Sequence, residues 1–254
     1  MIKNIPRSCQ VITYGLNSIA DVKAVSWKTE LNGTTIEVDS LWGKFHLAIQ
    51  SLGRFNIYNS LAVLASLLAS QNLTGNRFNL QSSNLDSAKI TDLMKQLKPS
   101  PGRLEIVAEK PSVLVDYAHT PDALQNVLEM LTTIKQNKIW VIFGCGGDRD
   151  KTKRPLMGKI ASEYADNIVI TNDNPRTENP EVIISEILKG IKKDIECWQI
   201  SDRKEAIEYV LKHAETDDIV LIAGKGHENY QIIGAQTLHF SDQEVVKNFF
   251  ASVI

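Results

Sequence analysis

Residues 139–180 read IWVIFGCGGDRDKTKRPLMGKIASEYADNIVITNDNPRTENP. The apolar run at 139–144 predicts a strand that is covered on both faces, and the glycine-rich segment after it predicts a turn into a helix beginning at Pro155. A second apolar run at 167–171 predicts another buried strand, which a polar loop follows. This order of strand, helix and strand is typical of a parallel sheet with helices packed on it.

The same alternation continues over the rest of residues 103–254. Helices are predicted at 121–135, 155–165, 180–192 and 203–213, and a proline at the tolerated first-turn position opens three of them. Further strands are predicted at 104–109, 112–119, 196–201 and 218–226, and residues 231–254 predict a short hairpin and a closing helix. The predicted fold class is therefore α/β, a Rossmann-like, mostly parallel sheet with helices on both faces.

The first hundred residues follow a different pattern. Partly alternating apolar residues predict β structure at 10–18 and 21–51, with a hairpin turn at Asn32-Gly33, and helical spacing predicts helices at 56–72 and 89–98. The run KPSPG at 98–102 is the best candidate boundary, giving domains 1–101 and 102–254. These elements make a small core for so many residues. They fit either the remnant of a larger domain or a complete small α+β domain.

Composition excludes several classes of protein. The chain of 254 residues is 43% hydrophobic and carries a formal charge of −2 without a long run of one sign, which argues against a nucleic-acid-binding surface. The three cysteines are widely spaced and odd in number, as in reduced cytosolic proteins. Because there is neither a long apolar run nor a signal-peptide pattern, we expect a cytoplasmic protein without a membrane partner. We also expect a monomer.

Polar side chains gather where the predicted strands end, at 116–122, 144–151, 172–178 and 224–228. In a doubly wound sheet these ends meet at one edge, and guanidinium and carboxylate groups there suit a ligand with both carboxylate and ammonium groups. Each loop also has a plainer explanation. Asp116 and His119 can cap a helix, Arg149 can be solvated, and Asp173 to Pro175 form a good turn. The glycines at 144–147 lack dinucleotide-binding or P-loop spacing.

Five motifs then resemble one family in their order and spacing: GRLE, VDYAHTPDAL, FGCGGDRDKTKRPLMG, TNDNPRTE and AGKGHE. They are similar to the Mur ligases of peptidoglycan synthesis, and within that family to members that add meso-diaminopimelate to UDP-N-acetylmuramoyl-L-alanyl-D-glutamate. A sixth segment, LGRFNIYNSLAVLAS, looks like the end of the family's central ATP-binding domain. The resemblance implies that 1–101 is the C-terminal part of that P-loop-type domain and that 102–254 is the amino-acid-binding domain.

The resemblance also implies roles for individual residues. Those matching contacts to meso-diaminopimelate are Arg149, Asp173, Asn174, Pro175, Arg176, Gly224 and Glu228. Those matching contacts to the nucleotide are Asn59, Arg103, Asp116 and His119. The DNPR sequence at 173–176 matches the signature that separates diaminopimelate-adding members from lysine-adding ones. No catalytic residue and no metal ligand is assigned within this sequence.

The implied activity is ATP-dependent amide synthesis with ATP and magnesium as cofactors and small molecules as substrates. The family's P-loop, its magnesium ligands and its UDP-binding domain do not occur in these 254 residues, so we expect them upstream and expect the fragment alone to be inactive. Two alternatives stay open: an amino-acid-binding module without catalysis, and a related ligase with another acceptor, such as L-lysine or a folylpolyglutamate. Arg176 weighs against the second because lysine lacks the second carboxylate.

Overall fold

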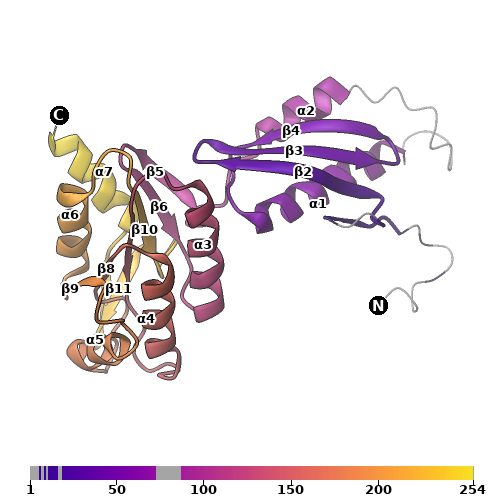
Figure 1. The fold of residues 1–254 in the computed structure, drawn as a ribbon. Helices are drawn as coiled ribbons and strands as arrows, with labels where there is room; N and C mark the ends of the chain where they lie inside the picture. The colour runs from indigo at the N-terminus through magenta and orange to yellow at the C-terminus, as the bar shows by residue number, and fades with distance from the viewer. Residues whose placement is uncertain (1–5, 7–8, 10, 17–18, 73–86, 254) are drawn as a thin grey trace. The chain divides into compact units, whose positions relative to one another are not determined.

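The computed structural model describes residues 6, 9, 11–16, 19–72 and 87–253 (Figure 1). Its contacts divide the chain into two compact units, Met1–Lys98 and Pro99–Ile254. The boundary expected at residues 101 and 102 lies close to this division and stays a prediction. In the described part of the chain, no helix is both long enough and apolar enough to cross a membrane.

The first unit is a four-stranded sheet with helices on one face (Figure 1). Strands β2 (Val22–Glu30), β3 (Gly33–Ser40) and β4 (Gly43–Ile49) form an antiparallel meander, and the short β1 (Tyr14–Gly15) pairs with β2 in parallel. Helices α1 (Arg54–Asn72) and α2 (Ser87–Lys95) pack on it. Alternate residues of the strands, such as Ile36, Val38 and Leu47, supply the core under these helices.

The second unit contains a six-stranded sheet in the order β5-β6-β10-β7-β8-β9. The five parallel strands are β6 (Ser112–Asp116), β7 (Ile139–Phe143), β8 (Asn167–Ile170), β9 (Glu196–Gln199) and β10 (Ile219–Ala223). Strand β5 (Glu105–Glu109) pairs with β6 in the antiparallel direction at one edge. Every residue of β6, β7, β8 and β10 is buried, which explains why their sequences are continuous apolar runs.

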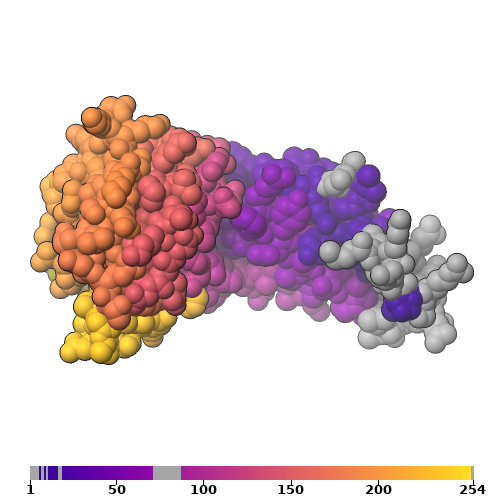
Figure 2. Space-filling view, turned by 90° about the horizontal axis from the view of Figure 1, so that it is seen from below, coloured from indigo at the N-terminus to yellow at the C-terminus, as the bar shows by residue number. Residues whose placement is uncertain are grey.

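Helices cover both faces of this sheet (Figure 1). Helices α3 (Pro121–Ile134), α4 (Lys153–Tyr164) and α5 (Pro180–Leu188) form one layer. Helices α6 (Arg203–His213) and α7 (Asp242–Val253) form the other, and α7 is at the surface of the unit (Figure 2). The hairpin of β11 (Tyr230–Ile233) and β12 (Gln236–His239) precedes α7. The predicted mostly parallel α/β fold, with its closing hairpin and helix, is confirmed.

Several predicted boundaries were wrong by a few residues. Helix α4 begins at Lys153, so Pro155 is its third residue, which is still within the first turn where backbone N–H groups lack helical partners. Helix α5 ends at Leu188, and the N–H groups of Gly190 and Ile191 donate to carbonyl oxygens three residues earlier instead of four. The strand expected at 112–119 ends at Asp116, whose carboxylate accepts the N–H of Ala118.

The first unit shows two further differences. The two-residue hairpin turn is formed by Leu31 and Asn32, and Gly33 is already paired with Glu30 as the first residue of β3. Within the predicted strand at 10–18, only Tyr14 and Gly15 are in a strand, and residues 10, 17 and 18 lie outside the described residues.

Candidate functional site

The loops after the parallel strands lie together at the carboxyl edge of the second sheet. The backbone N–H of Gly147, after β7, donates to the carbonyl oxygen of Asn174, after β8, at 2.9 Å. The N–H of Gly224, after β10, donates to the carbonyl oxygen of Asp116, at the end of β6, at 3.0 Å. Backbone hydrogen bonds therefore fix the relative positions of the loops that carry most of the predicted site residues.

The glycines at 144–147 allow two of these loops to pack backbone to backbone. A Cβ at Gly144 would collide with the carbonyl oxygen of Thr171, and one at Gly147 would collide with that of Pro175. A Cβ at Gly146 would lie 2.9 Å from Nη1 of Arg176 and 3.7 Å from Cγ of Arg149. The glycine run thus serves loop packing and leaves room for two arginines beside it.

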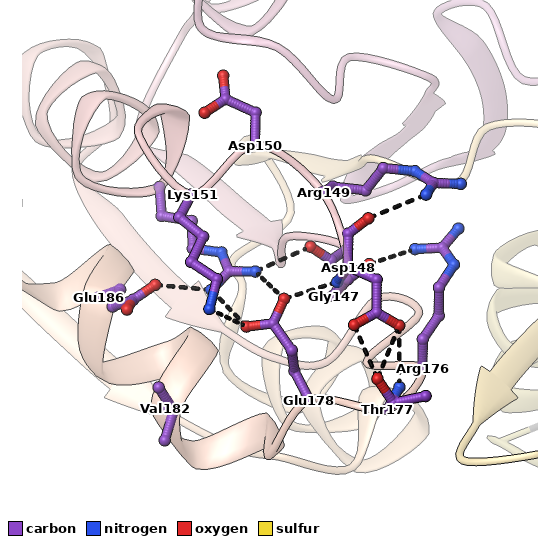
Figure 3. A network of polar contacts seen from close by, with 12 residues as sticks. Gly147, Asp148, Arg149, Asp150, Lys151, Arg176, Thr177, Glu178, Val182 and Glu186 are labelled. Carbon is purple, nitrogen blue, oxygen red and sulfur yellow. Dashed lines mark hydrogen bonds and ion pairs between the residues drawn. The ribbon is translucent and has the colours of Figure 1, made fainter.

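Arg149 and Arg176 extend to the same side of the backbone at 147–148 (Figure 3). Nη1 of Arg149 donates to the carbonyl oxygen of Asp148 at 3.0 Å, and Nη1 of Arg176 donates to that of Gly147 at 2.9 Å. Nη1 of Arg176 also donates to the carbonyl oxygen of Asn174 at 3.4 Å. Among the described residues, Nε and Nη2 of both guanidinium groups have no hydrogen-bond partner. Guanidinium groups pair with carboxylates through two parallel hydrogen bonds, so these free groups suit a carboxylate ligand.

The backbone of Arg176 is held in an unusual conformation. Its φ is 52°, in the left-handed region, and it forms an isolated bridge with Ile233. Its N–H donates to the carbonyl oxygen of Ile232 at 3.1 Å, and its own carbonyl oxygen accepts the N–H of Gly234 at 2.7 Å. The β11–β12 hairpin therefore sets the direction of the Arg176 side chain.

Asp148 joins the loop after β7 to the loop after β8. Its Oδ1 accepts the hydroxyl of Thr177 at 2.8 Å and its Oδ2 accepts the N–H of Thr177 at 3.2 Å (Figure 3). Its own N–H donates to Oε1 of Glu178 at 2.6 Å, and its φ is 54°. Asp148 thus has a positioning role between Arg149 and Arg176.

Below these loops lies a fully buried guanidinium, that of Arg154. It contacts Glu178 at 2.9 Å and Glu186 at 2.6 Å, and it donates to the carbonyl oxygen of Gly146 at 3.2 Å. Burial opposes its charge, but the hydrogen bonds to the two carboxylates outweigh burial, so the pKa of Arg154 is raised. Its Nε has no partner among the described residues. This buried ion network supports the glycine loop from underneath.

Glu178 makes the stability of this network depend on pH. Hydrogen bonds from Arg154, then from Lys151 and the N–H of Asp148, lower the pKa of its carboxyl group to about 2. Because this folded-state pKa lies below the unfolded value, Glu178 stabilises the fold above about pH 4.5, and the contribution disappears as the pH falls toward 2. We expect Lys151→Met to raise the pKa of Glu178, measured by carbon NMR of the carboxyl group.

Lys159→Met is the matched control for this prediction. Lys159 is also an exposed lysine of this region, but its ion-pair partner is Glu163 at 3.9 Å. The substitution Lys159→Met should therefore leave the pKa of Glu178 unchanged. Equal pKa values of Glu178 in the wild type and in Lys151→Met would contradict the assignment of Lys151 as a cause.

Asn174, whose carbonyl oxygen accepts Nη1 of Arg176, contacts Glu228 of the loop after β10. Nδ2 of Asn174 donates to Oε2 of Glu228 at 3.1 Å, and Oδ1 of Asn174 accepts the N–H of Ile232 at 3.0 Å. Asp173, at the start of the same loop, is buried, and its carbonyl oxygen accepts Nε2 of Gln231 at 2.7 Å. Gly224 has a φ of 113° beside the Asp173 carboxylate. Carboxylate oxygens in this corner suit an ammonium group.

Three residues predicted for the nucleotide lie around the ring of Tyr117. The guanidinium of Arg103 lies 4.5 Å from the ring centre, and the His119 ring lies 4.6 Å from it. Asp116 is largely buried, and its two oxygens accept the N–H groups of Leu104 and Ala118. Burial, as the largest effect, raises the pKa of Asp116, although these hydrogen bonds and Arg103 lower it. Asp116 therefore holds the segment carrying Arg103 in place.

The chain enters this unit directly beside the GKGHE loop. Gly102 has a φ of 65°, and a Cβ there would collide with the peptide between Gly226 and His227. Its N–H donates to Oε2 of Glu105 at 2.7 Å, and Nε2 of Gln243 donates to the same oxygen. Gln243 also donates to the carbonyl oxygen of Gly226 at 3.0 Å.

The remaining predicted residue, Asn59, lies in the first unit. It is exposed on α1, and its Nδ2 donates to Oδ1 of Asn56 at 3.3 Å. Within the described ranges, no group of three histidine, cysteine or acidic side chains is arranged to hold a metal ion.

Comparison with known protein families accounts for this arrangement. The model described as "Mur ligase, glutamate ligase domain" matches residues 102–226, and the model described as "Mur ligase middle domain" matches residues 1–67. The two matched segments follow each other along the chain without overlap. The chain belongs to the Mur ligase family.

Individual Mur ligases are similar over most of this chain. The UDP-N-acetylmuramoyl-L-alanyl-D-glutamate–2,6-diaminopimelate ligase 1 of Clostridium acetobutylicum is 42% identical over 242 residues, which are 94% of this chain and 47% of the relative. The ligase of the same name, without the numeral, from Haemophilus ducreyi is 44% identical over 235 residues, 91% of this chain and 44% of the relative. The chain thus spans about half the length of the curated relatives it matches.

A solved structure shows the same relation. The structure entitled UDP-N-acetylmuramoyl-L-alanyl-D-glutamate–2,6-diaminopimelate ligase aligns with a TM-score of 0.70 and 38% identity, covering 99% of this chain and 50% of that one. A folylpolyglutamate synthase from Mycobacterium tuberculosis, complexed with ADP and AMPPCP, aligns with a TM-score of 0.64 at 18% identity, which shows a shared fold alone.

The Mur ligase fold brings together most of the residues predicted from the motifs. Arg149, Asp173, Asn174, Arg176 and Glu228 lie on adjacent loops, with Pro175 and Gly224 in their backbone. Their roles toward a ligand stay predictions. Four supporting residues had no predicted role, although the quoted motifs contain all of them: Tyr117, Arg154, Glu178 and Lys225.

Proposed function

We propose that the protein containing these residues adds meso-diaminopimelate to UDP-N-acetylmuramoyl-L-alanyl-D-glutamate in an ATP-dependent reaction of peptidoglycan precursor synthesis. The names of relatives that are 40–44% identical over most of this chain support the reaction. The observation that carries the choice of amino acid is the presence, at one sheet edge, of two guanidinium groups without a carboxylate partner, on Arg149 and Arg176, and of a carboxylate on the nearby Glu228.

This pairing matches one end of diaminopimelate. That end is a zwitterion, with a carboxylate and an ammonium group on one carbon atom. Arg149 and Arg176 would bind the carboxylate through their forked N–H groups, and Glu228 with Asn174 would bind the ammonium group. The far amine of the same molecule would then be presented to the acceptor. L-Lysine has the ammonium group but no carboxylate at this end, so the arginines would distinguish the two amino acids.

In this proposal the second unit binds and orients the attacking amine. Orientation of two reactants can lower a barrier by several kcal/mol, about 7–11 in the best cases. ATP with magnesium would supply the phosphoryl group that activates the acceptor carboxylate. Arg103 is exposed and lies over Tyr117, so its charge fits a nucleotide phosphate. The described residues offer no magnesium site, so we place the magnesium ligands in other parts of the protein. We also propose that the protein acts as a cytoplasmic monomer.

Calorimetry on the 254-residue chain tests the choice of amino acid. We expect meso-diaminopimelate to bind about 10–150-fold more tightly than L-lysine, since hydrogen bonds to charged groups contribute about 1.5–3 kcal/mol. Equal affinities would contradict the proposed specificity, and tighter binding of L-lysine would support a lysine-adding ligase instead.

A phosphate-release assay separates a ligase from a simple binding module. With ATP, magnesium, the UDP-linked dipeptide and diaminopimelate, the longer polypeptide that contains this chain together with a P-loop should release phosphate only when all substrates are present. The 254 residues alone should release none, since they contain no P-loop sequence. Binding of diaminopimelate without turnover in the longer polypeptide would support the module.

A further inference from the structure

Beneath Asp173 and Glu228 lies a lysine whose charge is fully buried. The side chain of Lys225 has 0% exposure, whereas those of Asp173 and Glu228 are 11% and 18% exposed. A buried ammonium group is tolerated in a protein only when it is paired, because removing an ion from water costs several kcal/mol. The carboxylates therefore face the surface of the site, and the lysine supports them from inside.

The three N–H groups of the Lys225 ammonium match three oxygens. Nζ lies 3.3 Å from Oδ1 of Asp173, 3.2 Å from Oδ1 of Asn174 and 3.5 Å from Oε2 of Glu228. It also lies 5.7 Å from the ring centre of Tyr230. Lys225 thus binds the loop after β8 through two hydrogen bonds, to Asp173 and Asn174, and pairs with Glu228 of its own loop after β10 as an ion pair.

This arrangement leaves each carboxylate half occupied. Lys225 takes one oxygen of each, and the other oxygens, Oδ2 of Asp173 and Oε1 of Glu228, have no partner among the described residues. The formal charges of the three side chains sum to −1. Gly224 lies beside Oδ2, since a Cβ at that position would be 3.5 Å from it, in van der Waals contact. The cluster thus has free acceptors and one uncompensated negative charge.

We propose that Lys225 is a positioning residue for the ammonium-binding end of the site: it holds Asp173 and Glu228 so that their free oxygens and remaining charge receive the ammonium group of the incoming amino acid. This inference rests on the proposed function. In this proposal two carboxylates, those of Asp173 and Glu228, bind the ammonium group, with Lys225 as their counter-ion, whereas the proposed function used Glu228 with Asn174. Without Lys225 the two carboxylates would repel each other, and one would take up a proton or turn away.

The test uses three ligands that differ in one group each: meso-diaminopimelate, L-lysine and L-2-aminopimelate. L-Lysine lacks the carboxylate at the end under discussion, and L-2-aminopimelate lacks the ammonium group there. Calorimetry at neutral pH and constant salt gives two ratios of binding affinity for each variant. The preference for diaminopimelate over aminopimelate reports the ammonium site, and the preference over lysine reports the arginines.

For Lys225→Met we expect the preference over aminopimelate to fall about tenfold or more, the factor associated with a charged hydrogen bond, while the preference over lysine changes less than about twofold. Glu228→Gln, which keeps an acceptor oxygen but removes a charge, should act in the same direction. Lys159→Met, an exposed lysine on α4, is the matched control and should change neither ratio.

Two results would overturn the proposal. If neither ratio changes in a Lys225→Met protein that is folded by circular dichroism, Lys225 does not position the carboxylates. If both ratios fall equally, Lys225 only stabilises the loops in general. If Lys225→Met does not fold, Lys225→Gln, which keeps two donors without the charge, takes its place with the same expected ratios. Failure of the wild type to bind any of the three ligands would instead count against the proposed function.

Discussion

Replacing Arg203 by methionine is expected to lower the free energy of unfolding of the second unit by about 3–5 kcal/mol, the cost of removing one partner from a buried ion pair. Arg203 and Asp242 both have side chains with 0% exposure, and Nε and Nη2 of Arg203 donate to Oδ1 and Oδ2 of Asp242 at 2.8 and 2.9 Å. Burial opposes the charge of Arg203, but Asp242 outweighs it, so the pKa of the guanidinium is raised. Methionine would leave the Asp242 carboxylate buried without a partner.

The substitution of Arg203 would also remove hydrogen bonds to the loops that carry the predicted site residues. Nη2 of Arg203 donates to the carbonyl oxygen of Ala223 at 3.0 Å, one residue before Gly224, and Nη1 donates to that of Asn172 at 3.4 Å, one residue before Asp173. Urea unfolding followed by circular dichroism measures the change in stability. Calorimetry with meso-diaminopimelate, at temperatures where the variant remains folded, measures the accompanying loss of affinity.

Two variants control this experiment. Lys204→Met changes the next residue of α6, which is exposed and lies 3.7 Å from Glu208, and it should alter stability by less than about 0.5 kcal/mol. The double variant Arg203→Met/Asp242→Leu removes both charges and should be more stable than Arg203→Met alone. A double variant as unstable as the single one would show that the packing of Arg203, not its charge, is what matters.

Arg176→Ala is expected to weaken the binding of meso-diaminopimelate by about 1.5–3 kcal/mol, or roughly 10–150-fold, because charged hydrogen bonds to the ligand carboxylate are lost. The backbone cost of the left-handed conformation is the same for alanine and arginine, since both carry a Cβ. The variant therefore reports the side chain. Affinity for L-lysine, which offers no carboxylate there, should change much less, so the ratio of the two affinities should fall.

Arg54→Ala is the matched control, because Arg54 is an exposed arginine on α1 in the first unit. It should leave both affinities unchanged. Arg176→Lys keeps the charge without the forked donor geometry, so it should recover part of the preference. A preference in Arg176→Ala equal to that of the wild type would show that Arg176 does not contact the ligand carboxylate.

The strands of the second unit could be predicted because burial on both faces leaves continuous apolar sequence. Helix starts at Pro121, Pro180 and Arg203 were also predictable, since Thr120, Asn179 and Asp202 accept hydrogen bonds from N–H groups of the first turn. The end of α5 at Leu188, four residues before the predicted end, was not predictable. The close approach of Gly190 to the carbonyl oxygen of Pro155 was not predictable either, because Pro155 lies on another helix.

The candidate site shows more clearly that features set by contacts between distant elements cannot be predicted from the sequence. The segment GCGGDRDKTKR carries four positive side chains that look alike in the sequence, and a charged run is usually solvated. In the fold, Lys151 is 59% exposed and Arg154 has 0% exposure. Lys225 likewise stands in a glycine-rich turn but is fully buried. The motifs predicted residues for ligand contact, and these roles stay predictions, whereas the buried residues that support them were identifiable only from the fold.

The contact between Gly102 and the GKGHE loop has a mechanical consequence. A torsional change at Gly102 displaces the peptide between Gly226 and His227, because the two backbones touch and a tightly packed interior transmits strain. Glu105 and Gln243 brace the same contact through hydrogen bonds. The point at which the polypeptide enters the second unit thus packs directly against the segment that carries Lys225 and Glu228, so a change of torsion at Gly102 would also move these two residues.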